Sequence, residues 1–318
     1  MKKYLFSLTA SVVIALAVTS GYSQHGEINK IPHGINDGSA ARENNESPNW
    51  PGYATTTGST RKTTALNYYG GPLINTPAIY IIWYGNWNQN NGSKGDTPAG
   101  QQLIRDWANN IGGTPYFQLN TSLSVSGKPI SGNVTFGGEI ADSGTSTSLS
   151  DADIQSIVAR NIGGTKLPND PSGVYFVVTS SNVNENSGFC TNYCGWHTNA
   201  TISTLGNIRY SFVGNAQRCL SACAAQSVSP NGMPGIDGAV SVLSHELEEA
   251  TADPDINAWL DSRGYENADK CAWTFGHYQY QSGGAWANMN FGGHDWLIQR
   301  NILKSGGSFY CMVDATHN

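Results

Sequence analysis

Charged side chains are scarce in this chain of 318 residues. Lys, Arg, Asp and Glu make up 13% of it, about half the share in a typical soluble domain, and the formal net charge is −6. Binding to nucleic acid requires a clustered basic face, so the composition predicts no nucleic-acid partner. Hydrophobic residues at 39%, with many Gly, Asn, Ser and Thr, instead indicate a loop-rich globular protein.

Long apolar runs are lacking beyond the N-terminus. There, Lys2 and Lys3 precede YLFSLTASVVIALAV and then small residues, which is the arrangement of a secretory signal. We therefore expect a signal peptide over residues 1–23. A membrane anchor would need about 20 apolar residues and fits less well. The sequence predicts a protein that is secreted, extracellular or periplasmic, without a transmembrane segment once the signal is removed.

The chain also lacks a G-x-S-x-G elbow and a glycine-rich phosphate loop. The first positions the nucleophile of many serine hydrolases, and the second cradles nucleotide phosphates. Serine-hydrolase and nucleotide chemistry are therefore not indicated.

Regular hydrophobic patterns begin only at residue 66. Residues 24–65 are rich in Gly, Asn, Ser, Thr and Pro and are expected to form a disordered leader, linker or propeptide. From residue 66 the patterns predict one domain, 66–318, with strands at 78–85, 133–140, 173–180 and 207–216 and helices at 97–113, 149–164 and 235–254. This order predicts an α+β fold with a mixed sheet, packed helices and a small C-terminal lobe. We expect a monomer.

Six cysteines are present, and an even number in an exported chain favours disulfides. They are Cys190, Cys194, Cys219, Cys223, Cys271 and Cys311. Sequence does not fix their connectivity, but proximity along the chain suggests the pairs 190–194, 219–223 and 271–311. A zinc knuckle made of the four middle cysteines, with His197 nearby, is the less favoured alternative in an oxidising compartment.

The segment SHELEEATADPD, 244–255, lacks the second histidine of the zinc-peptidase motif HExxH. On a helix, His245 and Glu249 share one face because they are four residues apart. Both can bind one divalent ion, with Glu246 as the general base for its water. A carboxylate in place of histidine makes zinc less Lewis-acidic and widens the choice of metal towards manganese or calcium.

Two alternatives to this metal site are a hydrogen-bonded structural network and a calcium site without chemistry. Glutamates are common on solvated helix faces. However, five of the 23 acidic residues fall within positions 246–255, and like charges four apart on a helix repel. The crowding therefore favours a bound cation.

The ligand pattern resembles that of the thermolysin-like gluzincins. The resemblance rests on the HEL start, Ala250, Asp253 and the following acidic segment GYENADKC, 264–271. It implies a zincin-like sheet, Glu266 as third ligand, and Asp269 and Asp253 as supporting acids. The chain departs from the pattern in having Glu249 for histidine and a shorter gap to Glu266.

Other candidate residues are less specific. Asp255 lies ten residues after His245, where metzincin-type proteins place their third ligand, and it competes with Glu266 for that role. His277 and His294 lie among aromatic residues and are candidates for lining a cleft, although such histidines more often pack structurally. His197 is expected to be structural.

A second resemblance, to the EXORDIUM or phosphate-induced protein family, covers nearly all of 66–314. It rests on YYGGPLINTPAIYIIWYGNW, GFCTNYCGWH, RCLSACA, SPNGMPGIDGAVSVLSHE and SFYC. The resemblance implies export and an association with cell walls, as in plant members that have no settled enzymatic role. It further implies a bacterial branch, in which the HExxE helix and an acidic E..D.C segment occur together.

Two functions follow from these patterns. The leading hypothesis is a secreted metal-dependent hydrolase, a zinc endopeptidase-like enzyme in which His245, Glu249 and Glu266 bind zinc and Glu246 activates water against a peptide or protein substrate. The alternative is a non-catalytic extracellular protein that binds cell-wall glycan, using some of the nine Trp and 15 Tyr as stacking platforms.

Overall fold

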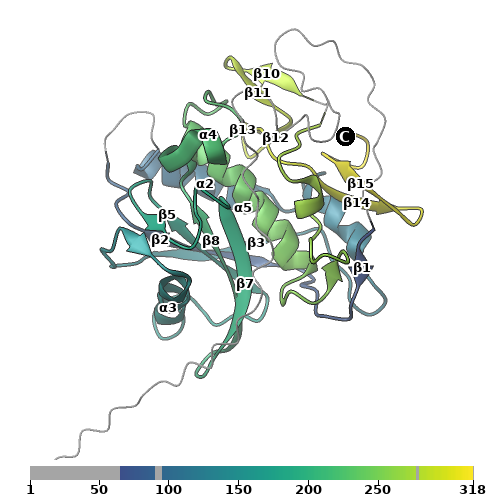
Figure 1. Cartoon of the computed structure of the whole chain (residues 1–318), viewed down its shortest axis with the longest axis horizontal. Helices are drawn as coiled ribbons and strands as arrows, with labels where there is room; N and C mark the ends of the chain where they lie inside the picture. The colour runs from purple at the N-terminus through teal and green to yellow at the C-terminus, as the bar shows by residue number, and fades with distance from the viewer. Residues whose placement is uncertain (1–64, 90–94, 277–278, 318) are drawn as a thin grey trace, which may run out of the picture.

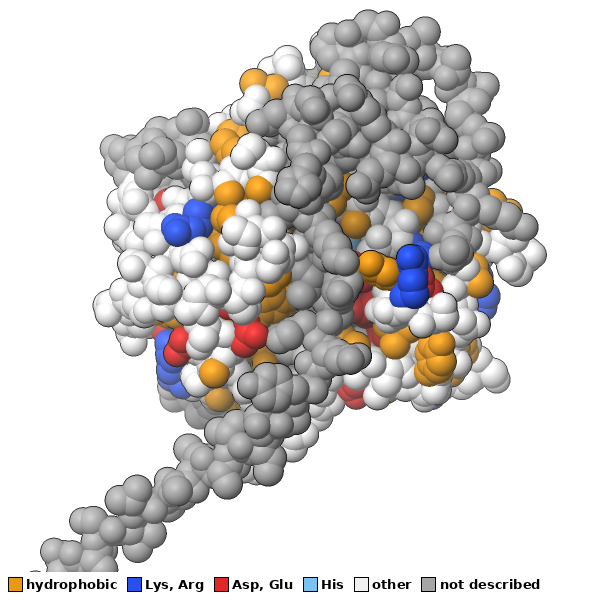
Figure 2. Space-filling model, viewed as in Figure 1, with side chains coloured by type: hydrophobic (Ala, Val, Ile, Leu, Met, Phe, Trp, Pro, Cys, Tyr) orange, Lys and Arg blue, Asp and Glu red, His pale blue; other side chains and the backbone are white. Residues whose placement is uncertain are grey.

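The computed structural model describes residues 65–89, 95–276 and 279–317 (Figure 1). The predicted signal peptide and all but the last residue of the predicted leader lie outside this range. Within the described residues, no helix combines the length and the apolar character that crossing a bilayer requires. On the face shown in Figure 2, the Lys and Arg side chains are few and scattered among uncharged groups.

A five-stranded mixed sheet, in the order β3-β2-β5-β8-β7, forms the centre of the fold. Its strands are β2 (Ala78–Tyr84), β3 (Thr135–Ala141), β5 (Gly173–Thr179), β7 (Gly195–Ile202) and β8 (Gly206–Gly214). All neighbouring strands are parallel except β7, which pairs antiparallel with β8 at the edge. Every residue of β2 and β5 is buried, as expected for parallel strands that are covered on both faces.

Helices cover both faces of this sheet. They are α2 (Pro98–Asn110), α3 (Asp151–Asn161) and α5 (Pro234–Ala252). The chain passes from β2 through α2 to β3 on one side of β2, and then from β3 through α3 to β5 on the other side of β2. The two connections therefore cross the sheet in opposite directions. Right-handed crossovers therefore place α2 and α3 on opposite faces. Helix α5 contacts α2, β7 and β8, so it shares a face with α2 (Figure 1).

Helix α5 is buried all round. Each residue from 235 to 252 is buried, including the predicted apolar face formed by Val240, Leu243, Leu247 and Ala250. The opposite face is covered by the C-terminal segment, where Asn301 Nδ2 donates to Glu248 Oε2 at 2.6 Å. The acidic residues of this helix therefore do not form a solvated face.

The C-terminal segment consists of three hairpins beside α5 (Figure 1). They are β10 (Tyr280–Ser282) with β11 (Ala285–Ala287), β12 (Met289–Phe291) with β13 (His294–Trp296), and β14 (Asn301–Ser305) with β15 (Ser308–Met312). Trp296, Ile298 and Met312 belong to the main hydrophobic core. Ile302 and Phe309 join Leu66 and Trp259 in a second cluster. The mixed α+β architecture is confirmed.

Short elements complete the fold. They are the strand pairs β1 (Asn67–Tyr68) with β9 (Trp259–Leu260) and β4 (Ser148–Leu149) with β6 (Asn184–Glu185), the helix α4 (Leu220–Cys223), and the 3-10 helices η2 (Phe117–Leu123), η3 (Ala216–Cys219) and η4 (Asp269–Cys271).

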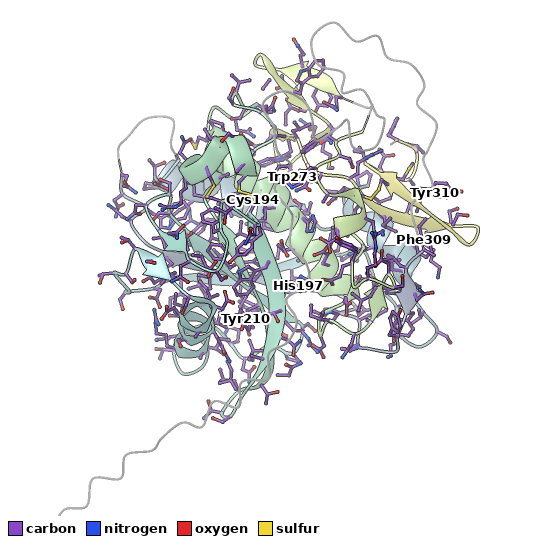
Figure 3. The ribbon with its side chains drawn as sticks, viewed as in Figure 1. Cys194, His197, Tyr210, Trp273, Phe309 and Tyr310 are labelled. Atoms are coloured by element: carbon purple, nitrogen blue, oxygen red, sulfur yellow. A yellow bond between two sulfur atoms is a disulfide. The ribbon has the colours of Figure 1, made fainter. Side chains whose placement is uncertain are left out.

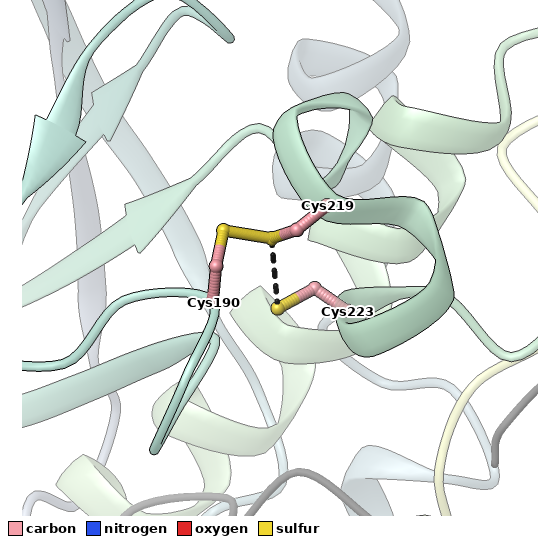
Figure 4. Close-up of side chains that lie close together, drawn as sticks. All are labelled: Cys190, Cys219 and Cys223. Carbon is pink, nitrogen blue, oxygen red and sulfur yellow. Dashed lines mark hydrogen bonds between the residues drawn. A yellow bond between two sulfur atoms is a disulfide. The ribbon is translucent and has the colours of Figure 1, made fainter. Parts of the chain in front are cut away.

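Two of the three expected disulfides are wrong, and the third, Cys271–Cys311, is confirmed. The observed pairs are Cys190–Cys219 and Cys194–Cys223. The antiparallel pairing of β7 with β8 places Gly195 opposite Val213. The segment before β7 and the segment after β8 therefore lie side by side, and their cysteines pair across the two segments, as Figure 4 shows for Cys190 and Cys219.

The N-terminus of α3 is closed by a capping box. Ser150 Oγ accepts from the backbone of Asp153, and the Asp153 carboxylate accepts from the backbone of Ser150. We expect Ser150→Ala to lower the free energy of unfolding by about 1 kcal/mol, measured by urea denaturation. Ser156→Ala on the exposed face of the same helix is the control, and an equal loss in both variants would contradict the capping role.

Candidate functional site

Helix α5 meets two segments that are distant from it in sequence, β7 and the region around η4. The helix contributes His245, Glu246 and Glu249, because these side chains lie within one turn of each other. Strand β7 contributes His197, which Figure 3 places at the junction of the sheet and the helix. The segment that leads into η4 contributes Glu266, and Asp269 is the first residue of η4. We call these six residues the buried centre.

His245, Glu249 and Asp269 form the first group of ligand-type atoms in the buried centre. His245 Nε2 lies 3.0 Å from Glu249 Oε1 and 3.5 Å from Asp269 Oδ1. Glu249 Oε1 also accepts the backbone amide of Asp269 at 2.8 Å. This amide fixes the carboxylate of Glu249 and brings the Asp269 side chain within 3.5 Å of the His245 imidazole.

His197, Glu249 and Glu266 form the second group. His197 Nε2 lies 3.5 Å from Glu266 Oε1, and His197 Nδ1 lies 3.6 Å from Glu249 Oε2. The same Nδ1 is 3.4 Å from Glu246 Oε2. The structure thus distributes the predicted ligands His245, Glu249 and Glu266 over two groups that share Glu249.

Several polar atoms in the buried centre have no hydrogen-bond partner among the described residues. They are both carboxylate oxygens of Glu266, Glu246 Oε1 and both ring nitrogens of His245. His245 Nε2 is close to Glu249 Oε1, yet the pair lacks the geometry of a hydrogen bond. Two ligands of a tetrahedral zinc ion lie about 3.4 Å apart, which is close to the observed 3.0–3.6 Å. These residues therefore fit a divalent cation.

Burial makes the buried centre electrostatically costly without a cation. Burial, followed by the charge of Asp269, raises the pKa of Glu249 to about 7. Burial also raises the pKa of Glu266 well above its usual value, and the carboxylate of Glu249 adds to this. Burial alone would lower the pKa of His197, but Glu246 and Glu249 outweigh it and the net pKa is raised. A divalent cation would relieve this repulsion.

Asp253 and Asp255, the other acids at the end of α5, have structural contacts. Asp253 Oδ1 accepts the backbone amides of Asn257 and Ala258 at 2.6 and 2.7 Å and so shapes the turn after the helix. Asp255 forms an ion pair with Arg209, with Oδ1 2.9 Å from Nε. Asp255 is therefore engaged outside the buried centre, and among the described residues it belongs to neither group of ligand-type atoms.

The remaining metal and cleft candidates do not join the buried centre. His294 Nε2 lies 3.0 Å from Asp106 Oδ2, so it links β13 to α2. His277 lies outside the described residues. All six cysteines are in disulfides, so the alternative of a zinc knuckle is wrong even though Cys190, Cys219 and Cys223 lie together (Figure 4).

A polar surface pocket of about 700 Å³ is lined in part by the Cys190–Cys219 disulfide. Its lining includes Ser181, Asn184, Asn186, Thr191, Gln217 and Arg218. Ser181 and Gln217 follow the carboxyl ends of the parallel strands β5 and β8, which is where ligands commonly bind in open α/β sheets. The buried carboxylate of Asp96 accepts from Ser181 N at 2.9 Å and from Asn215 Nδ2 at 2.7 Å, and holds both loops in place.

Sequence reasoning missed His197 as a member of the buried centre. The mixed pattern of GWHTNATI does not predict a strand, and the neighbouring cysteines indicate a structural role for His197. The sequence nevertheless contains a signal for the position of His197. An edge strand that pairs with β8, the strand before α5, is expected to lie against α5. Recognising β7 would have placed His197 there.

Comparisons with known proteins agree on one family. A family model described as the phosphate-induced protein 1 conserved region matches residues 66–289. Protein EXORDIUM-like 5 of Arabidopsis thaliana is 31% identical over 224 residues, covering 61% of this chain and 59% of that protein. Protein EXORDIUM-like 3 of the same plant is 30% identical over 264 residues, covering 72% of this chain and 74% of that protein. No solved structure matches significantly, so the zincin-like fold stays a prediction.

These matches correct the leading functional hypothesis. The expected secreted zinc endopeptidase is wrong, because the matching family and relatives are EXORDIUM-like proteins and not peptidases. The finer assignment to a bacterial branch stays a prediction. The family model covers most of the chain, and the second relative covers more than two thirds of it. The chain therefore belongs to the EXORDIUM, or phosphate-induced protein 1, family.

Proposed function

We propose that this chain is a non-catalytic extracellular protein of the EXORDIUM type that binds cell-wall carbohydrate. Family membership and the three disulfides support an extracellular role. The observation that carries the proposal is the polar pocket at the carboxyl ends of β5 and β8.

The chemistry of the pocket suits sugar hydroxyls. Its amide, hydroxyl and guanidinium groups offer both donors and acceptors. Gln217 lines the pocket, and its buried Oε1 has no hydrogen-bond partner among the described residues. Arg218 is held by Asn184 Oδ1, which accepts from its Nε at 3.2 Å. The pocket is thus a fixed set of polar groups.

The expected tryptophan platforms receive little support. Seven of the nine tryptophans are buried, namely Trp83, Trp87, Trp107, Trp196, Trp259, Trp273 and Trp296. Hydrogen bonds to sugar hydroxyls, rather than stacking on these rings, would therefore carry recognition.

Glycan-array screening followed by calorimetry tests this proposal. We expect Gln217→Ala and Asn186→Ala each to weaken binding of the selected glycan about tenfold, or about 1.4 kcal/mol, because each removes a polar partner. Gln102→Ala, a matched change at the exposed residue of α2 that donates to Asp106, should leave affinity unchanged. A protein that binds no glycan, or pocket variants that bind like the wild type, would overturn the proposal.

We further propose that the buried centre binds a divalent cation in a structural role. His245, Glu249, Asp269, His197 and Glu266 would hold it, and zinc is the expected ion, with manganese as an alternative for a carboxylate-rich set. The cation would supply positive charge to buried carboxylates. The support is that the side chains of His197, His245, Glu249, Glu266 and Asp269 are at most 3% exposed. The ligands connect α5, β7 and the segment before η4.

A further inference from the structure

We propose that the buried centre holds two divalent cations bridged by the carboxylate of Glu249. One ion would lie among His245, Glu249 and Asp269, and the other among His197, Glu249 and Glu266. This inference rests on the proposed metal binding and adds a second ion that neither the HExxE pattern nor the family relationship assigns.

The first argument is the arrangement of the ligand atoms. In each group, all ligand atoms lie within 4.8 Å of one another, and Glu249 belongs to both groups. Its Oε1 is 3.0 Å from His245 Nε2, whereas its Oε2 is 3.6 Å from His197 Nδ1. The two oxygens of one carboxylate thus face different imidazoles. This is the arrangement of a carboxylate that bridges two metals.

The second argument is the environment of His197. Its Nε2 lies 3.4 Å from the backbone oxygen of Asp253, and its Nδ1 lies 3.6 Å from Glu249 Oε2 and 3.4 Å from Glu246 Oε2. A histidine that binds a metal usually donates its other ring N–H to a carboxylate or carbonyl. A proton on Nε2 directed to the Asp253 carbonyl oxygen leaves Nδ1, the nitrogen that faces Glu249 Oε2, for the second ion. The Asp253 carbonyl would then orient the imidazole.

The third argument is the balance of charge. Four carboxylates, those of Glu246, Glu249, Glu266 and Asp269, make ion pairs with the two imidazoles. Two divalent cations would balance the four carboxylates with both imidazoles neutral, which is the state that binds metal. A single divalent cation would leave two of the four negative charges unbalanced.

The fourth argument is Glu266 itself. It is fully buried, and neither of its oxygens has a hydrogen-bond partner among the described residues. An ion held only by His245, Glu249 and Asp269 would leave this carboxylate without a partner. An ion in the second group provides one.

Metal stoichiometry tests the inference. The full chain is stripped of metal, dialysed against Zn²⁺ and analysed by mass spectrometry of the elements. We expect two zinc ions per chain in the wild type, one in His245→Ala and one in His197→Ala, and fewer than one in Glu249→Gln. His294→Ala is the matched control, because it removes a histidine paired with an acid outside the buried centre, and it should retain two ions.

A spectroscopic readout covers the case in which a variant does not fold. Wild-type protein loaded with Mn²⁺ should give the electron paramagnetic resonance spectrum of a coupled pair at two equivalents. One ion per chain, or an isolated Mn²⁺ spectrum at saturation, would overturn the bridged pair while leaving the proposed single structural cation intact. The absence of bound metal would overturn both.

Discussion

Removal of divalent cations at about pH 8 is expected to lower the free energy of unfolding by about 4 kcal/mol, the stabilisation given by a ligand at about a thousand times its dissociation constant. For a domain of this size, such a loss corresponds to a fall in the midpoint of thermal unfolding on the order of 10 °C. Differential scanning calorimetry before and after chelation measures it.

The physical reason is the concentration of buried acid in the buried centre. Glu246, Glu249 and Glu266 are almost fully buried around two imidazoles. Burial of a charged group that lacks an adequate partner is strongly unfavourable. A bound cation offsets this cost and also connects α5 to β7 and to the segment before η4. Its removal leaves the repulsion without compensation.

Controls separate this effect from a general action of the chelator. A chelator saturated with zinc beforehand should cause no loss, and re-addition of zinc should restore the midpoint. Glu266→Gln should reduce the effect of chelation, because it removes a charge and a ligand from the buried centre. An unchanged midpoint in chelated wild-type protein would contradict a structural cation.

The second large effect is an unusual pH dependence of the metal-free protein. We expect its free energy of unfolding to fall as the pH rises from about 4 to about 8. Burial is the main reason that the pKa of Glu249 is raised to about 7 and that of Asp253 to about 6, from about 4 in an unfolded chain. For His245, burial lowers the pKa, but the charge of Glu249 and its neighbours outweighs this and raises it well above the usual value.

Each of these groups changes the free energy of unfolding with pH in the same direction. A pKa that is raised on folding means that the folded chain holds the proton more tightly. The corresponding stability is present in full below the unfolded pKa and is lost as the pH rises through the folded one. The shift of Glu249 alone corresponds to about 3 kcal/mol. Metal-loaded protein should show the opposite trend, because protons compete with the cation for the same ligands.

Urea denaturation at several pH values, with and without zinc, measures both trends. The result that supports the account is a crossing of the two curves, with zinc giving little stabilisation near pH 5 and most near pH 8. A metal-free protein that becomes more stable between these values would show that the carboxylates of the buried centre are not held as described.

Much of the scaffold follows from local pattern. The apolar runs at 78–85 and 173–180 predict β2 and β5, because parallel strands covered on both faces must be apolar throughout. The spacing of Val240, Leu243 and Leu247 predicts α5. The same spacing places His245 and Glu249 on one face, and the structure brings them to 3.0 Å. Glu266 and Asp269 were also expected near them.

The features that the sequence does not predict depend on contacts between segments that are distant along the chain. The short edge strand β7 has a mixed pattern, and its pairing with β8 determines both the position of His197 and the disulfides. Neither follows from spacing along the chain. Motif similarity likewise gave a peptidase, because HExxE describes which ligands share a helix face and not what reaction, if any, takes place beside them. The family relationship corrected that hypothesis.

Anomalous X-ray diffraction at the zinc edge, from crystals of zinc-loaded protein, is the most direct measurement of the central claim. The account predicts strong anomalous peaks on either side of the Glu249 carboxylate, one next to His245 and Asp269 and one next to His197 and Glu266. A well-ordered map in which these side chains contact only each other or water, without an anomalous peak, would contradict it.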